Sequence, residues 1–154
     1  MKNLSLIAAA ILLMQLTTFP QYPELLIDIQ VGGEGSSPND FTEVNDIMFF
    51  TADDGINGRE LWKTDGTVNG TVMVKDIYAG PDDSSPSSLT NINGTLYFKA
   101  FDNSHGREVW KSDGTESGTV LLKDINPGNA SVNEHTHYFL NNNVLLYFTR
   151  NDVT

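Results

Sequence analysis

Cysteine is absent from this 154-residue chain, and basic residues are scarce: nine Lys and Arg against twenty Asp and Glu give a formal net charge of −11. Without cysteine the chain cannot form a disulfide, a thiol nucleophile, a cysteine-ligated zinc site or an iron–sulfur cluster. Its scattered basic residues do not form the clusters that bind phosphates, which excludes a nucleic-acid partner. An acidic surface favours solubility and suits a neutral or cationic partner.

Long hydrophobic runs are also absent, with one exception near the N-terminus. Lys2 is followed by an apolar run of thirteen residues, Leu4 to Leu16, interrupted only by Ser5 and Gln15. A helix needs about 20 apolar residues to span a bilayer, so we expect no membrane span. The run instead predicts a signal peptide over residues 1–20, which directs the protein to the exterior, the cell surface or the periplasm. The alternative interpretation is a buried N-terminal helix.

A long segment of the chain occurs twice. RELWKTDGTVNGTV at 59–72 and REVWKSDGTESGTV at 107–120 are identical at ten of fourteen positions, and the offset of 48 residues also relates Lys-Asp-Ile at 75–77 to 123–125. A fixed period of about 20 to 50 residues is typical of repeat architectures. The predicted organisation is a signal peptide at 1–20, repeat one at 21–72, repeat two at 73–120 and a partial repeat three at 121–154.

Short segments rich in β-branched and aromatic residues, bounded by turn residues, predict four strands in each repeat. In the second repeat they are Val72–Ile77, Ser88–Asn91, Thr95–Phe101 and Glu108–Lys111. Tight hairpin turns are expected at dipeptides whose residues tolerate positive φ: Asp65-Gly66, Asn69-Gly70, Asn93-Gly94 and Asp113-Gly114. No segment after the apolar run has a helical period.

Both faces of the predicted strands carry apolar residues. In Thr95–Phe101, Leu96, Phe98 and Ala100 share one face, and we expect Tyr97 and Trp110 on the other. A sheet that is apolar on both faces must be covered on both, as it is when sheets stack. The predicted fold is therefore all-β, with tandem 48-residue, four-stranded antiparallel units arranged as β-propeller-like blades.

The predicted ring is incomplete, because a propeller closes with about four to eight blades. Two repeats and part of a third are too few. We therefore expect the chain to be a fragment of a longer protein, with the remaining blades supplied by that longer chain. The alternative is self-association, in which several copies of a short chain assemble the ring.

ELWKTDGT at 60–67 and EVWKSDGT at 108–115, with the flanking GTVMVKDIYAG and GTVLLKDINPG, resemble the ELWxxDGT repeat family. The resemblance covers roughly residues 25 to 150. It implies a large bacterial protein, secreted or at the cell surface, with propeller-like β structure, and it implies no reaction. The chain departs from the family pattern at Val109, and within 130–143 of the third copy. The structural signature residues are Glu60, Trp62, Asp65, Gly66, Thr67, Asp76, Glu108, Trp110, Asp113, Gly114, Thr115 and Asp124.

Acidic residues recur at equivalent places in the repeats, which favours structural roles over catalytic ones. Asp65 and Asp113 are expected to accept the backbone N–H two residues further on and so to fix a turn. Three other carboxylates are predicted to lie inside apolar strands, where burial is costly without a partner: Asp28, Asp76 and Asp124. Their expected partners are Lys75, Lys123, Arg59 and Arg107.

Two acidic turns are weak candidates for calcium sites, with Asp53, Asp54, Asn57, Asp102 and Asn103 as ligands. The EF-hand pattern fails because positions 3 and 12, counted from Asp53, are Gly55 and Thr64. A solvated turn is the default interpretation, and a looser site that also uses carbonyl oxygens is the alternative. No other cofactor is expected.

The three histidines form no recognisable metal site. His135 and His137 would share one face of a strand, but a closed zinc site has about four ligands and no further one is evident. His105 occupies a turn where the first repeat has Asn57, which indicates a role in that turn.

Nucleophile-elbow, phosphate-loop and dinucleotide motifs are absent. The sequence therefore predicts a secreted or cell-surface repeat scaffold: a non-catalytic module for binding or adhesion, with a carbohydrate or protein ligand, and not an enzyme. The alternative is a piece of an extracellular carbohydrate-active enzyme built on a propeller. Its catalytic acids would have to break the repeat symmetry, as Glu116 does against Val68, or lie in the segment Glu134–His137.

Overall fold

The computed structural model describes residues 25–32, 35–125, 127–128, 137–141 and 144–148, the last two ranges by their backbone. These residues contain ten β-strands and no helix, which confirms the predicted all-β class. Accordingly, this part of the chain holds no helix with the length and apolar character that crossing a membrane requires.

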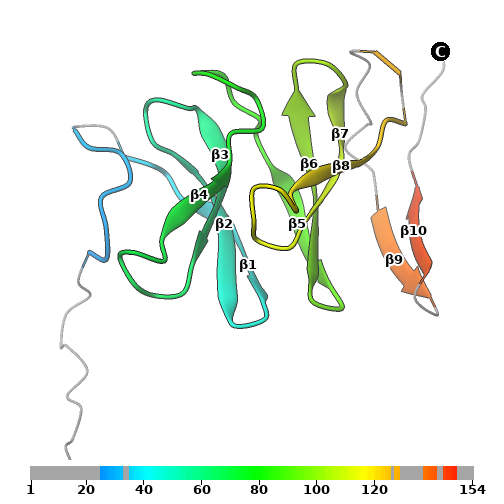
Figure 1. Ribbon diagram of the computed structural model, residues 1–154, viewed down its shortest axis with the longest axis horizontal. Helices are drawn as coiled ribbons and strands as arrows, with labels where there is room; N and C mark the ends of the chain where they lie inside the picture. Colours follow the sequence, from blue (N-terminus) through cyan, green and yellow to red (C-terminus); the bar gives the residue numbers. More distant parts are fainter. Residues whose placement is uncertain (1–24, 33–34, 126, 129–136, 142–143, 149–154) are drawn as a thin grey trace, which may run out of the picture.

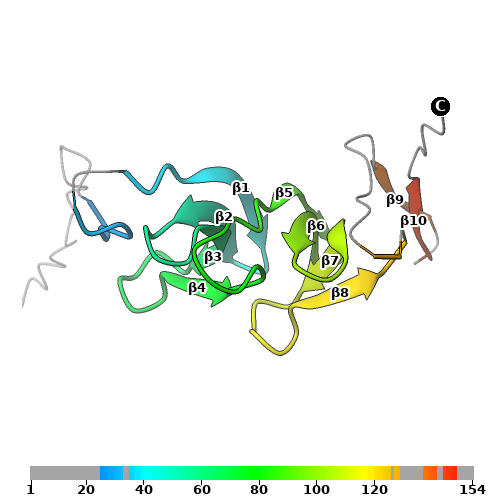
Figure 2. The ribbon, with the colours of Figure 1, turned by 90° about the horizontal axis from the view of Figure 1, so that it is seen from above.

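Eight of the strands form two four-stranded antiparallel sheets that stand next to each other (Figures 1 and 2). Sheet one has the order β1 (Asn39–Val44), β2 (Ile47–Asp53), β3 (Arg59–Thr64) and β4 (Val72–Lys75). Sheet two has the order β5 (Ser87–Ile92), β6 (Thr95–Asp102), β7 (Gly106–Ser112) and β8 (Val120–Lys123). A separate antiparallel pair, β9 (His137–Asn141) and β10 (Val144–Phe148), lies beyond sheet two.

The two sheets pair their strands in the same register, 48 residues apart. Phe50 on β2 faces Trp62 on β3, and Phe98 on β6 faces Trp110 on β7. The register between the last two strands of each sheet shifts at equivalent points, Leu61/Trp62 and Val109/Trp110. The sequence repeat therefore corresponds to a repeated pattern of hydrogen bonding.

The limits of the sheets differ from the limits of the sequence repeats. Segment Val72–Lys75, which crosses from the end of repeat one into repeat two, pairs with β3 and closes sheet one. Sheet one thus spans residues 39–75 and sheet two spans 87–123. The last strand of each sheet, β4 or β8, therefore lies mostly in the next sequence repeat.

The turn predictions hold at one of four dipeptides. Asn93-Gly94 joins β5 to β6 with φ angles of 51° and 79°, as predicted. Asp65-Gly66 and Asn69-Gly70 lie instead in the longer connection between β3 and β4, so the tight hairpin expected there is wrong, and Asp113-Gly114 differs in the same way. These longer connections are held by side-chain hydrogen bonds that the dipeptides alone do not reveal.

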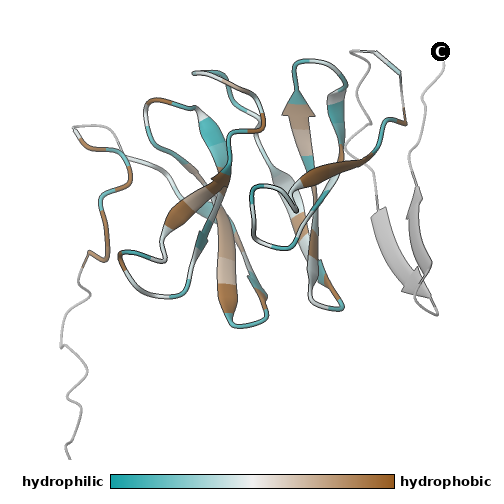
Figure 3. Cartoon of the chain, viewed as in Figure 1, coloured by the Kyte–Doolittle hydropathy of each residue, from teal (hydrophilic) through white to brown (hydrophobic). Residues whose placement is uncertain are grey.

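The main core lies between the two sheets. Val44, Phe49, Leu61 and Val74 of sheet one pack against residues of sheet two, namely Leu96, Phe98, Ala100 and Trp110. The prediction that Trp110 points away from Phe98 is wrong, because the two are direct partners across β6 and β7, and such partners share a face. Hydrophobic residues also lie along β4 and β8, the last strand of each sheet (Figure 3).

The opposite face of sheet one carries a smaller apolar cluster. Phe50, Ala52 and Trp62 are buried there, with Ile29 and Met73 packed against them. Phe41 stacks on Phe50 at 5.6 Å between ring centroids and is 60% exposed. Sheet one is therefore apolar on both faces, as expected.

Candidate functional site

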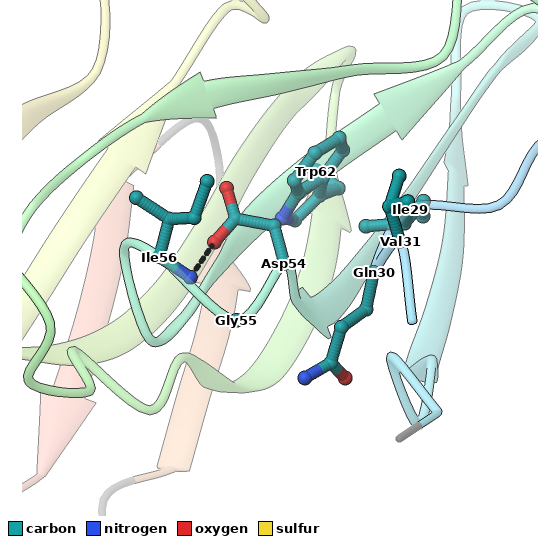
Figure 4. Close-up of a pocket in the computed structure, with 7 residues that line it drawn as sticks. All are labelled: Ile29, Gln30, Val31, Asp54, Gly55, Ile56 and Trp62. Carbon is teal, nitrogen blue, oxygen red and sulfur yellow. Dashed lines mark hydrogen bonds between the residues drawn. The ribbon is translucent and has the colours of Figure 1, made fainter. Parts of the chain in front are cut away.

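An open pocket of about 290 Å³ lies at the edge of this smaller cluster (Figure 4). Two segments and one strand build it. Residues 29–31 run along one side, the turn between β2 and β3 forms the other, and Trp62 on β3 lies between them. The lining residues are Ile29, Gln30, Val31, Asp54, Gly55, Ile56 and Trp62. We call this site the Trp62 pocket.

The Trp62 pocket combines apolar rim residues with two hydrogen-bonding groups. Val31 is 90% exposed and Ile56 is 73% exposed, whereas Trp62 is 8% exposed and forms the wall. The Gln30 amide lies against the turn, since a Cβ on Gly55 would be 2.9 Å from Gln30 Nε2. An apolar rim with a carboxylate and an amide suits a neutral ligand that has both apolar and hydroxyl surfaces.

Asp54 is held rigidly by its own turn. Its Oδ1 accepts the backbone N–H groups of Ile56 at 2.9 Å and Asn57 at 2.7 Å, and its Oδ2 accepts Asn57 Nδ2 at 2.7 Å. Burial would raise the pKa of Asp54, but these hydrogen bonds outweigh it and hold the pKa below its usual value. The carboxylate is therefore charged at neutral pH and fixed in orientation.

The remaining calcium candidates also bond within their turns. Asp53 Oδ1 accepts the Gly55 N–H at 2.7 Å. In sheet two, Asp102 Oδ1 accepts the Ser104 and His105 N–H groups at 2.8 and 2.6 Å, with Asn103 in the same turn. The two turns belong to different sheets, so their carboxylates form no common site. Within the described ranges, no three His, Asp or Glu side chains are grouped to hold a metal ion.

His105 has the role in a turn that its position indicated. Its Nδ1 lies 2.7 Å from Asp102 Oδ2. The hydrogen bond that Asp102 accepts from the His105 ring raises the pKa of His105 above its usual value. Of the other two histidines, His135 lies outside the described residues, and only the backbone of His137 is described.

Asp65 and Asp113 organise the connections that follow β3 and β7. Asp65 Oδ1 accepts the Thr67 backbone N–H at 2.9 Å and the Thr67 hydroxyl at 2.7 Å, and Asp113 makes the same two bonds to Thr115 at the same distances. The predicted bond, in which each Asp accepts the backbone N–H of the residue two positions further on, is therefore present. The hydrogen bonds to Thr67 and Thr115 lower the pKa values of these carboxyls.

Glu60 has a role that the sequence analysis did not identify. Its side chain on β3 is 0% exposed and accepts four hydrogen bonds, from the backbone N–H groups of Ile77, Tyr78 and Ser84 and from the Ser84 hydroxyl at 2.6 Å. It thus holds the connection from β4 to β5, which joins the two sheets. Burial raises the pKa of Glu60 to about 7, although the hydrogen bonds oppose this. Glu108, at the equivalent place on β7, is also 0% exposed.

The predicted pairing with the recurrent Asp residues is wrong for Lys75 and Arg59. Asp76 and Asp124 follow β4 and β8 instead of lying inside them, and Asp28 is exposed and outside any strand. Asp76 Oδ2 accepts the Gly80 N–H at 3.2 Å. The basic side chains bond to other oxygens: Lys75 to the Thr119 carbonyl, and Arg59 to Ser37 and Thr51. The carbonyls of Ser37 and Thr119 and the Thr51 hydroxyl, which sequence alone does not place, take the bonds instead.

Several predictions concern residues that the structure does not describe. They are the signal peptide at 1–20 and most of the segment Glu134–His137. Val68 and Glu116, which break the repeat symmetry, are both exposed in equivalent connections. Neither lies in the Trp62 pocket.

Comparison with protein-family models found no match for the chain. Comparisons with curated proteins and with solved structures likewise found no similar protein.

Proposed function

We propose that this chain is a secreted or cell-surface repeat scaffold that binds a neutral carbohydrate at the Trp62 pocket without chemical turnover. Its sheets are blades of a propeller-like array of the ELWxxDGT type. The stacked sheets supply a rigid frame, and the turn of Asp54 with the segment before β1 supplies the binding surface. Loops on such a frame commonly carry the binding function.

One observation carries the choice of ligand. The pocket sets the exposed apolar side chains of Val31 and Ile56 beside the Asp54 carboxylate and the Gln30 amide. Sugar rings have apolar C–H faces and a rim of hydroxyl groups, so they can use both kinds of surface. A net charge of −11 also disfavours acidic ligands.

An enzymatic function is less well supported than binding. Glu60, whose pKa burial raises to about 7, is 0% exposed and has its four donors inside the protein. A substrate cannot reach it without disrupting the link between the sheets. Asp54, the carboxylate in the pocket, has a lowered pKa and cannot serve as a general acid at neutral pH.

Tryptophan fluorescence tests the binding proposal. Trp62 lines the pocket and Trp110 lies in the main core, so a ligand should alter the emission of Trp62 alone. Titration with neutral oligosaccharides should give a saturable change. Ile56→Ala and Gln30→Ala should each weaken binding by about tenfold, which corresponds to about 1.4 kcal/mol. Val68→Ala, at another exposed apolar site, is the matched control.

Failure of every oligosaccharide to change the emission would reject the carbohydrate proposal. A saturable response to a protein ligand instead, lost in Ile56→Ala, would keep the scaffold function and replace the ligand class. Export is tested separately, by N-terminal sequencing of protein recovered outside the cytoplasm. A start beyond residue 16 would support the predicted signal peptide, whereas an intact Met1 would reject it.

A further inference from the structure

The two sheets meet at a joint made by Lys63 and Gly114. Lys63 Nζ on β3 donates a hydrogen bond of 2.7 Å to the Gly114 carbonyl, in the connection between β7 and β8. The Phe49 ring closes over the same place, since a Cβ on Gly114 would lie 3.1 Å from Phe49 Cζ. Gly114 is accordingly buried. This joint holds the connection of sheet two against the strands of sheet one.

The equivalent connection of sheet one has no such neighbour. Gly66 lies 48 positions before Gly114 and has nearly the same backbone, with φ of 86° against 88°. Gly66 is exposed, and a Cβ on it would meet no atom within 4 Å. The segment Asp65–Thr71 is thus built like the one in the joint and contacts nothing at this glycine.

The matching receptor surface on sheet two is accessible around Tyr97 and Lys111, which are half-buried, whereas Lys99 and Val109 on the same face are buried. Lys111 and Tyr97 face each other across β6 and β7 as Lys63 and Phe49 do across β2 and β3. Lys111 forms no hydrogen bond within the described part of the chain, whereas Lys63 does. It lines a pocket of about 280 Å³, which we call the Lys111 pocket, with Thr95, Ser112, Asp113, Ser117, Gly118 and Val120.

Charge favours the same pairing. In the existing joint, Lys63 lies near the carboxylates of both sheets: after the hydrogen bonds of Thr67 and Thr115, its charge adds to the lowering of the pKa values of Asp65 and Asp113. Asp113 is the one acidic residue among those that line the Lys111 pocket. Asp65 of a second copy would give Lys111 the same arrangement as Lys63, with one lysine between two carboxylates.

We propose that the segment Asp65–Thr71 of one copy of this chain docks into the Lys111 pocket of a second copy. Lys111 then donates to the Gly66 carbonyl of the other chain, and Tyr97 covers Gly66 as Phe49 covers Gly114. The proposal extends the scaffold function and uses a surface distinct from the Trp62 pocket. Such a contact is head-to-tail, so each added copy leaves one docking segment and one pocket free, and assembly continues to a closed ring or an open chain.

Two substitutions separate the two sides of the contact. Lys111→Glu reverses the charge in the pocket but leaves the docking segment intact. Gly66→Asn blocks the docking segment, because asparagine tolerates positive φ and its side chain would occupy the space that Tyr97 must take. Gly80→Asn is the matched control, since Gly80 also has a positive φ of 111° and open space around it.

Analytical ultracentrifugation of the full chain, in about 0.15 M salt to screen the net charge, measures association. The average mass of the wild type and of Gly80→Asn should rise with concentration above the monomer mass of 17.0 kDa. Lys111→Glu and Gly66→Asn should each associate at least tenfold more weakly. An equimolar mixture of the two should form heterodimers and nothing larger, because only one intact segment and one intact pocket can meet.

A wild type that remains monomeric at hundreds of micromolar would overturn the proposal. So would association that both variants retain, since it would use another surface. Neither substitution touches the Trp62 pocket. A wild type that binds oligosaccharides but stays monomeric would overturn this inference alone, and one that associates without binding oligosaccharides would overturn the proposed ligand alone.

Discussion

A Cβ placed on Gly70 would lie 1.9 Å from Asp65 Oδ1, and a Cβ on Gly118 would lie 2.0 Å from Asp113 Oδ1. The carboxylate that fixes each connection therefore occupies the space of a side chain at the glycine five residues later. The spacing Asp-Gly-Thr-x-x-Gly-Thr follows from this contact: the Asp position requires the second glycine.

We expect Gly70→Ala to lower the urea midpoint of unfolding, because the methyl group displaces the Asp65 carboxylate from both of its bonds to Thr67. In an Asp65→Ala background the same substitution should have almost no effect, since the clash is gone. Equilibrium urea unfolding of the two single variants and the double variant measures this coupling. Additive effects of the two substitutions would contradict the explanation.

Phe98→Ala and Phe50→Ala compare the two apolar faces at equivalent positions. Phe98 is 0% exposed in the main core between the sheets, and its truncation should cost about 3 to 5 kcal/mol. Phe50 lies in the smaller cluster beneath the exposed Phe41, where the surroundings can relax, so its truncation should cost less. Chemical denaturation gives both values. Equal losses would mean that the outer face of sheet one is covered as fully as the inner one.

Glu60 should make stability fall as pH rises toward neutrality. Its pKa in the folded protein is about 7, above the value of 4.5 for a free side chain, so the folded state binds this proton more tightly. The contribution is full below about pH 4.5 and is lost as pH rises through 7, with an upper limit of about 3 kcal/mol.

The difference in unfolding free energy between the wild type and Glu60→Gln, followed from pH 5 to 8, isolates this group. The other titrating side chains, His105 among them, are common to both proteins and cancel. The wild type should lose stability relative to the variant across this range. A constant difference would show that Glu60 is ionised throughout, as its four hydrogen-bond donors alone would favour.

Asp102→Asn should lower the pKa of His105. The hydrogen bond that Asp102 accepts from the imidazolium is the main cause of its raised value, and an amide cannot stabilise the imidazolium as a carboxylate does. NMR titration of the imidazole signals gives the pKa in each protein. Ser104→Ala, which leaves the carboxylate in place, is the control and should leave the pKa of His105 unchanged.

Sequence reasoning located the strands well because their signals are local. The alternation in Thr95–Phe101 and the turn residues Asn93-Gly94 identify β6 and its hairpin without any knowledge of the rest of the fold. The grouping of strands into sheets was not accessible in this way. Val72–Lys75 belongs to sheet one because of a pairing with β3 that no local pattern specifies.

The candidate site depended even more on long-range contacts. Asp54 was identified from its acidic turn, but the lining by residues 29–31 arises only when that segment lies along sheet one. Similarly, Glu60 was recognised as part of a repeated motif, yet its bonds reach Ser84, 24 residues further on. A buried Glu in an apolar strand was the available signal, because such a group needs internal donors.

The boundaries of the sequence repeats differ from those of the sheets, and this affects how such a chain can change in length. Removing the 48 residues between a point in sheet one and the equivalent point in sheet two leaves four strands in the same order. Deleting Glu60–Arg107, for example, would join Arg59 to Glu108 and let β1 and β2 pair with β7 and β8 as one four-stranded sheet. Gene duplication or loss within these two sheets therefore need not respect the boundaries of either sheet, because the order of the four strands is kept.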